Sequence, residues 1–150
     1  MAMEIRFARI NEIDQIVELS KKFADENCCN GVVADDYNYF FGKKVAVVVN
    51  KDVIIGYAYG EVGIEITNRS YSKINDKYYY IDEMYIDKEY RNQGIGKRLY
   101  QYLEQYAIDN KCVSIQLNAV SKDYKSLLKF YIEELGFEFL NALLIKHIGR

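Results

Sequence analysis

The stretch Arg91-Asn92-Gln93-Gly94-Ile95-Gly96 joins a strand-like run, 78–87, to a helix-like run that continues to about Asn110. The first run is rich in aromatic and β-branched residues, and the second carries an apolar stripe at helical spacing. Because glycine has no Cβ, Gly94 and Gly96 allow a ligand to approach the backbone closely. The beginning of a helix also leaves amide hydrogens without intrahelical partners, and its dipole favours anions. With Lys97 and Arg98 beside it, this junction predicts a phosphate-binding loop.

Two other phosphate-binding motifs fit the spacing poorly. A Walker A loop, G-x-x-x-x-G-K-[ST], lacks its first glycine here, and Arg98 stands where a serine or threonine would follow the lysine. A dinucleotide fingerprint needs a third glycine where this chain has Leu99, and the loop lies far from the N-terminus. Nucleotide hydrolysis and dinucleotide binding are therefore disfavoured.

The rest of the chain alternates between strand-like and helix-like runs, with no linker or repeat between them. We expect strands at 3–8, 45–50, 53–62, 78–87 and 113–119, and a final strand pair within 137–148 around Asn141. We expect helices from a cap at Asn11 to about Phe23, near 35–40, at 95–110, and at 123–135, where Gly136 ends the last one. These elements predict a mixed α/β sheet.

The composition favours a folded protein that does not bind nucleic acid. Of 150 residues, 50% are hydrophobic and 28% are charged, which is enough for a sizeable core in a single domain spanning residues 1–150. A net charge of −2 does not supply the positive field that holds proteins on phosphate backbones.

Cysteine usage and hydropathy indicate the compartment. Cys28, Cys29 and Cys112 are an odd number without metal-ligand spacing, which favours a reducing environment and argues against a metal site. No stretch approaches the ~18 consecutive apolar residues that a membrane span needs. Glu4 and Arg6 stand where a signal peptide would carry its apolar core. We therefore expect a cytoplasmic protein that binds neither a metal nor a membrane.

The central loop resembles the signature Q/R-x-x-G-x-G/A of the GNAT family of N-acetyltransferases, which Arg91, Gly94 and Gly96 match. The residues 86–90 before it and Leu135-Gly136-Phe137 after the last helix resemble the same family, as does the order of elements over nearly the whole chain. The resemblance implies the acyl-CoA N-acyltransferase fold, in which helices flank a central, mixed and mostly antiparallel sheet.

The resemblance also implies where acetyl-coenzyme A (acetyl-CoA) binds. It would lie in a V-shaped split between the central strand and the strand at 113–119. Backbone groups of Met84, Tyr85 and Ile86 would pair with the pantetheine arm, and Asn118 would contact the pantetheine amides. The pyrophosphate would rest on the loop formed by Arg91, Asn92, Gln93, Gly94, Ile95, Gly96 and Lys97.

Acetyl transfer to an amine requires a base. An alkylamine with a pKa of ~10.4 is protonated at neutral pH, and removing that proton costs roughly 4–5 kcal/mol. By strand alternation Ile81, Glu83 and Tyr85 share one face, and Asp82 lies on the other. Relatives that acetylate aminoglycosides or polyamines often carry a carboxylate eleven residues before the first loop glycine, which implies Glu83 as the base. Asp82 is the fallback, and a solvated surface position for Glu83 is the alternative.

The departing thiolate needs a proton, and in this family a tyrosine of the last helix commonly supplies it. Tyr131 is the candidate. Tyr131 stands five positions before Gly136 instead of the usual four, and one extra residue turns a helical side chain by about 100°. Either a bulge in the helix compensates for this rotation, or Tyr124 or another tyrosine donates the proton instead. The family also implies that the backbone amide of Met84 or Tyr85 binds the carbonyl oxygen.

The sequence thus predicts an N-acetyltransferase that moves an acetyl group from acetyl-CoA to a primary amine of a small molecule or peptide. The carboxylates Asp82, Glu83, Glu61 and Glu65 favour a cationic acceptor. The alternative is a non-catalytic acyl-CoA-binding module that senses the cofactor or regulates a partner. Dimers are common among the proteins it resembles, and the aromatic C-terminal strands are candidates to form a homodimer.

Overall fold

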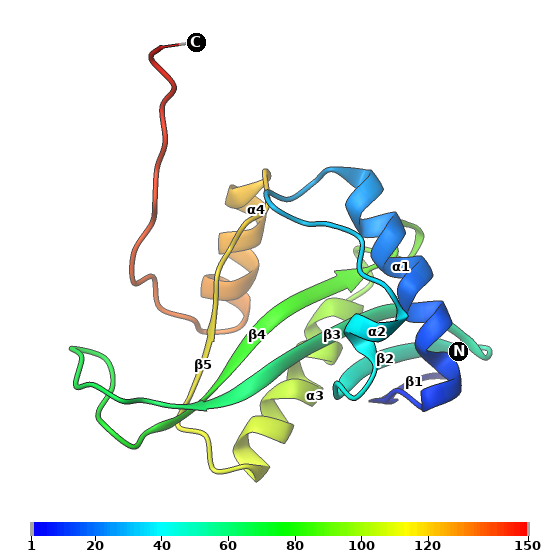
Figure 1. Cartoon of the computed structure of the whole chain (residues 1–150), viewed down its shortest axis with the longest axis horizontal. Coiled ribbons are helices and arrows are strands. Elements are labelled where there is room, and N and C mark those ends of the chain that lie inside the picture. The colour runs from blue at the N-terminus through cyan, green and yellow to red at the C-terminus, as the bar shows by residue number, and fades with distance from the viewer. Residues whose placement is uncertain (1, 150) are drawn as a thin grey trace.

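A computed structural model describes residues 2–149 and contains one five-stranded sheet in the order β1-β2-β3-β4-β5 (Figure 1). The first four strands pair in antiparallel fashion, and β5 runs parallel to β4. The strands are β1 (Met3–Phe7), β2 (Val45–Asn50), β3 (Val53–Ile64), β4 (Lys77–Ile86) and β5 (Ser114–Leu117). The expected mixed and mostly antiparallel sheet is confirmed.

Helices cover both faces of this sheet (Figure 1). The longer elements are α1 (Ile13–Glu26) and α3 (Ile95–Asp109), and the shorter ones are α2 (Tyr37–Phe40), α4 (Tyr124–Leu128), the 3-10 turns η1 (Ile10–Glu12) and η2 (Lys88–Tyr90), and the π-helix η3 (Lys129–Glu134). One core joins α1 and α2 to one face, and a second core joins α3 to the opposite face. β2 is buried on both sides, because alternate residues enter the two cores.

Local sequence explains the hairpin but not the start of α1. Lys51 and Asp52 both adopt positive φ angles, 50° and 65°, as a two-residue turn between twisted strands requires. The expected cap at Asn11 is wrong. Instead η1 precedes α1, and the Glu12 carboxylate accepts from the Arg9 amide at 2.7 Å and from Arg6 at 2.8 Å. Glu12 therefore takes the N-cap position of α1, and its carboxylate binds Arg6 and Arg9, which precede the helix.

A β-bulge in β4 changes which side chains share a face. Tyr59 pairs with Glu83 and the next residue, Gly60, pairs with Ile81, so Asp82 is the extra residue. The extra residue reverses the alternation, because the strand period is two. Ile81 therefore belongs to the core beside α3, whereas Tyr85 belongs to the core beside α1. The expected common face of Ile81, Glu83 and Tyr85 is wrong for Ile81.

The final strand pair expected within 137–148 is also wrong. Among the described residues, 136–149 form no regular secondary structure, and Figure 1 shows this segment running away from the body. Phe137 still packs against Tyr100 and Tyr131, with ring centroids 5.5 and 5.3 Å apart. Strand propensity is not sufficient here, because a strand forms only where a neighbouring edge accepts its hydrogen bonds.

The bulge leads to a stability prediction at Gly60. A Cβ at this position would overlap the Tyr80 carbonyl oxygen on the neighbouring strand. We expect Gly60→Ala to lower the free energy of unfolding by about 1–3 kcal/mol, because the extra methyl group would force the packed backbone to shift. Denaturant unfolding measures this, with Gly149→Ala, which has open space around it, as the control. Equal midpoints for both variants would contradict the bulge geometry.

Candidate functional site

The site begins where β4 and β5 separate. Their pairing runs from Tyr78 and Ser114 to Ile81 and Leu117, and β4 then continues to Ile86 without a β5 partner in the described structure. A cleft of about 450 Å³ opens there, between β4, the end of β5, the start of α3 and the last helix. This is the split expected from the sequence.

Most of the predicted site residues border this cleft. Those that line it are Glu83, Met84, Tyr85, Ile86, Arg91, Asn92, Ile95, Gly96, Asn118 and Tyr131. Gln93, Gly94 and Lys97 belong to the same loop but do not line the cleft wall. The sequence did not indicate that Phe23, Cys28, Cys29 and Val32 would form the opposite wall, because no motif marks the end of α1.

The N-terminus of α3 faces the cleft without a capping side chain. Gly94 is its N-cap residue, with φ 77° and ψ 8°, and no side chain of the described residues accepts from the first-turn amides. The Gly94 carbonyl accepts the first hydrogen bond of the helix from the Arg98 amide, at 3.2 Å. The amides of Ile95, Gly96 and Lys97 come before Arg98 in the chain and form the open first turn. The nearest atom to a Cβ on Gly96 would be the tip of Phe130, at 3.9 Å. The geometry suits an anion on these amides.

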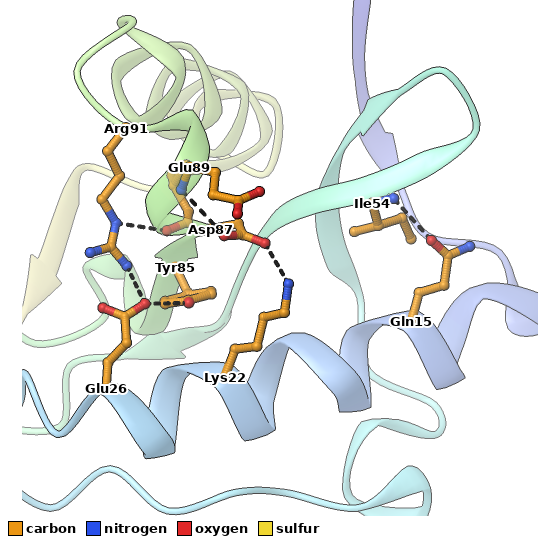
Figure 2. A network of polar contacts seen from close by, with 9 residues as sticks. Gln15, Lys22, Glu26, Ile54, Tyr85, Asp87, Glu89 and Arg91 are labelled. Carbon is orange, nitrogen blue, oxygen red and sulfur yellow. Dashed lines mark hydrogen bonds and ion pairs between the residues drawn. The ribbon is translucent and has the colours of Figure 1, made fainter.

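The side chain of Arg91 has protein partners (Figure 2). Its Nε donates to the Ile86 carbonyl at 2.8 Å, and its Nη2 contacts Glu26 Oε1, also at 2.8 Å. The Tyr85 hydroxyl donates to the same Glu26 oxygen at 2.5 Å. Burial alone would favour the neutral form of Glu26, but these two donors outweigh it and lower the pKa of the carboxyl. The Arg91 charge is thus paired with α1 and is not free on the loop.

Two further contacts hold α1 against the sheet, one beside this loop and one at the start of β3 (Figure 2). Lys22 contacts Asp87 at 2.8 Å, and Gln15 accepts from the Ile54 amide at 2.9 Å. Burial opposes ionisation of Asp87, yet Lys22 and the Glu89 amide lower its pKa. The Lys22 contact positions the end of β4, from which the loop starts, relative to α1, and the Gln15 contact fixes α1 to the start of β3.

Glu83 lies half-buried at the cleft and accepts two phenol hydrogen bonds. Tyr57 donates to Oε1 at 2.9 Å and Tyr59 donates to Oε2 at 2.7 Å. The Tyr59 hydroxyl is also 2.9 Å from that of Tyr39. Burial raises the pKa of Glu83, and the two phenols offset only part of this effect. The alternative of a solvated sheet position does not describe this carboxylate.

A π-helical turn accommodates the extra residue before Gly136. The Leu135 amide donates to Phe130 O at 3.1 Å, a five-residue step, and the Phe137 amide donates to Tyr131 O at 2.9 Å. Such a turn takes one more residue than an α-helical turn. Tyr131 is 7% exposed and lines the cleft, and burial raises its pKa. Tyr124 is 57% exposed and is not part of the cleft wall.

The loop after α1 closes over the cleft and touches the segment after β5. Asn30 donates its amide to Val120 O, and Lys122 donates its amide to Cys28 O, each at 2.9 Å. Asn118, beyond the end of β5, donates to the Tyr80 hydroxyl at 2.6 Å.

Burial, together with Cys28, raises the pKa of Cys29 to about 11, so this thiol is protonated at neutral pH. A neutral thiol is a poor nucleophile.

No cluster of His, Cys, Asp or Glu in residues 2–149 could hold a metal ion. Over the same residues, every helix is too short or too polar to span a bilayer.

A comparison with family models agrees with this geometry. The model described as "Acetyltransferase (GNAT) family" matches residues 10–137. This chain belongs to the GNAT family. The resemblance to this family is confirmed.

Solved structures share the GNAT fold at low sequence identity. A Trypanosoma brucei acetyltransferase is 18% identical with a TM-score of 0.71, and the match covers 98% of this chain and 100% of that chain. A ribosomal-protein-alanine N-acetyltransferase from Brucella melitensis biovar Abortus 2308 is 15% identical, with a TM-score of 0.72 and coverage of 98% and 100%. AAC(6')-Iy, in complex with the bisubstrate analog CoA-S-monomethyl-acetylneamine, is 14% identical, with a TM-score of 0.72 and coverage of 99% of both chains. No curated protein matches the sequence.

The Glu26 pairs of this GNAT protein predict a pH dependence of stability. Because the folded state lowers the pKa of Glu26, its contribution is present above the unfolded value of about 4.3 and is lost as the pH falls through the folded value. We expect Glu26→Gln to lower the free energy of unfolding at neutral pH by about 1–2 kcal/mol, with the difference from wild type shrinking in acid. Denaturant unfolding at several pH values measures it.

The control for this series is Glu18→Gln, which removes an exposed pair with Lys21 on the same helix. Exposed pairs contribute little, so this variant should follow the wild type. An equal loss at acid and neutral pH for Glu26→Gln would argue against the Arg91 and Tyr85 contacts.

Proposed function

We propose that this protein is a single-domain enzyme, spanning residues 1–150, that transfers an acetyl group from acetyl-CoA to a primary amine of a small molecule or peptide. The observation that carries the proposal is the cleft beyond Ile81 and Leu117. It brings the uncapped start of α3 together with a half-buried carboxylate and a buried phenol. Membership of the GNAT family supports this reaction class.

The residues present fit acetyl-CoA. The loop of Arg91, Asn92, Gln93, Gly94, Ile95, Gly96 and Lys97 would hold the pyrophosphate on its backbone amides. The edge of β4 that β5 leaves open at Met84, Tyr85 and Ile86 would hydrogen-bond the pantetheine arm as an added strand, with Asn118 across the split. At Ile86 the amide is the group left for this role, because the carbonyl accepts from Arg91 Nε. The bound thioester supplies an acetyl group that an amine can attack. No metal is required for this chemistry.

Glu83 is the proposed general base, acting directly or through a water. Its raised pKa makes it a stronger base than an exposed carboxylate, while the Tyr57 and Tyr59 hydroxyls hold its two oxygens in place. Asp82, exposed on the bulge, remains the fallback. After proton removal, the amine nitrogen carries the lone pair that forms the new amide bond.

Tyr131 is the proposed acid. Burial keeps its phenol protonated at neutral pH, so it can donate a proton or a hydrogen bond to the departing sulfur. The backbone amide of Met84 or Tyr85 would donate to the carbonyl oxygen as that oxygen becomes negative.

The proposed acceptor is cationic. Burial is the main cause of the raised pKa of Glu83, and the nearby charges of Asp35 and Asp82 raise it further. Burial likewise raises the pKa of Asp82, and the charge of Glu61 adds to that effect. Such a group of carboxylates attracts a protonated amine. Glu65 is not part of this group, because its carboxylate is 3.6 Å from Arg69 and also accepts from Gln116.

A cytoplasmic location, which the three free cysteines favour, belongs to the same proposal.

The direct test measures free thiol released from acetyl-CoA with a panel of amines. We expect Glu83→Gln to reduce kcat by about a hundredfold or more and to leave coenzyme A binding unchanged, because the variant keeps the size of the side chain and removes the base. Full activity of Glu83→Gln with loss in Asp82→Asn would transfer the role to Asp82. Binding of coenzyme A without turnover of any amine would favour the non-catalytic module.

A second test uses the pH profile of kcat/KM. Glu83 acts as a base only when ionised, so activity rises with pH through its pKa. Tyr59→Phe removes a donor that lowers this pKa, and we therefore expect the acid limb to move to higher pH. Tyr71→Phe, an exposed tyrosine in the β3–β4 connection, is the control. An unchanged acid limb in Tyr59→Phe would argue against Glu83 as the titrating group.

A further inference from the structure

Cys28 and Cys29 stand side by side on the cleft wall opposite β4. Both residues line the cleft and are half-buried, and their Sγ atoms are 3.9 Å apart. The backbone holds the pair there, because Cys28 O accepts from the Lys122 amide at 2.9 Å and Cys29 forms a bridge with Ser121. Two thiols are therefore fixed next to each other at the edge of the proposed coenzyme A site.

The proposed acetyl transfer leaves this pair without a function. Its protons move through Glu83 and Tyr131, and the acetyl group is carried by the sulfur of coenzyme A. The pantetheine arm that ends in this sulfur would lie along 84–86, on the other side of the same cleft. A cleft of about 450 Å³ admits one small ligand or the reactive end of a larger one. The ligand sulfur and the two protein sulfurs would therefore share one space.

The surroundings of the two thiols give them different roles. Burial, followed by the charge and the hydrogen bond of Cys28, raises the pKa of Cys29 to about 11. Since only a thiolate attacks a disulfide, Cys28 is the better first nucleophile. Once the Cys28 sulfur is part of a disulfide it carries neither a charge nor a proton, so both of its effects on Cys29 vanish. The pKa of Cys29 then falls, and the charge of Arg91, which already lowers it, remains in place.

We propose that Cys28 and Cys29 form a second reactive site in the cleft, which reduces coenzyme A disulfide by thiol–disulfide exchange. The Cys28 thiolate attacks one sulfur of the ligand, the S–S bond of the ligand breaks, and one half stays on Cys28 as a mixed disulfide. The other half leaves as a thiolate and takes up the proton that Cys28 released. Cys29 then attacks the Cys28 sulfur across 3.9 Å, and the second half leaves as coenzyme A thiol.

The electrons of this exchange balance without a further reactant. Two protein thiols are oxidised to one disulfide, and one coenzyme A disulfide is reduced to two thiols. The site rests on the coenzyme A binding proposed above, and the mixed disulfide keeps acetyl-CoA out of the cleft while it lasts. Free thiols reverse the exchange, so the site makes acetyl transfer depend on the ratio of coenzyme A disulfide to coenzyme A thiol.

The test incubates the full chain with an excess of coenzyme A disulfide, alkylates the remaining thiols and maps them by mass spectrometry. We expect the wild type to lose two of its three alkylatable thiols and to carry a Cys28–Cys29 disulfide. Cys29→Ser lacks the second thiol and should stop with one coenzyme A on Cys28. Cys28→Ser should react at least about tenfold more slowly. Cys112→Ser, at a thiol outside the cleft wall, is the matched control and should behave like the wild type.

Two comparisons show whether the cleft directs the reaction. Glutathione disulfide has the same kind of S–S bond but no pyrophosphate for the start of α3, and we expect it to react at least about tenfold more slowly. Saturating acetyl-CoA occupies the cleft and carries no free thiol or disulfide. It should slow the reaction with coenzyme A disulfide by at least about tenfold as well.

Thermal melting with acetyl-CoA separates this proposal from the acetyl transfer, because it reports binding without thiol chemistry. A wild-type protein that binds acetyl-CoA but keeps all three thiols alkylatable would overturn the thiol site alone. Equal rates with both disulfides, reaction confined to Cys112, or a mixed disulfide that Cys29 never resolves would do the same. A protein that acetyl-CoA does not stabilise would overturn both proposals.

Discussion

The structure of the site depends on the point at which β4 and β5 stop sharing hydrogen bonds. Up to Ile81 and Leu117 the two strands satisfy each other, and beyond that point the backbone of β4 faces an open cleft. Unpaired backbone groups next to an apolar wall are costly unless a partner or water binds them. The same separation puts the start of α3 at the end of the cleft, so that the strand edge and the helix amides face the same space.

Two half-buried glutamates near this cleft show how surroundings decide the behaviour of one residue type. Glu26 accepts from a guanidinium and a phenol, and its pKa falls. Glu83 accepts from two phenols, which carry no charge, and burial raises its pKa. The first carboxylate is stabilised in its ionised form and ties α1 to the loop. The second is held in place but remains able to accept a proton, as the proposed base must.

Local patterns predicted the elements, whereas contacts between elements determined the details of the site. The periodicity of 95–110 and of Ile13, Ile16 and Phe23 corresponds to real buried faces. The bulge at Asp82 escaped prediction, because a register shift depends on the partner strand and leaves no mark in alternation. The partner of Arg91 also escaped it, since Glu26 stands 65 positions away. The prediction of the final strands failed for a related reason: strand composition is local, whereas pairing needs a partner strand, and the described residues after 136 pair with none.

By itself the sequence determined, through its loop motif, the resemblance to the GNAT family, and it determined the order of helices and strands up to residue 135 and the glycine-containing loop before α3. These follow from neighbours along the chain, through side-chain period, turn residues and the missing Cβ of glycine. Only the tertiary structure decided that Tyr57 and Tyr59 hold Glu83, that a π-turn directs Tyr131 to the cleft, and that the C-terminal segment stays unpaired. Hydrogen bonding, burial and pairing depend on which distant residues the fold brings together, and that information does not lie in local spacing.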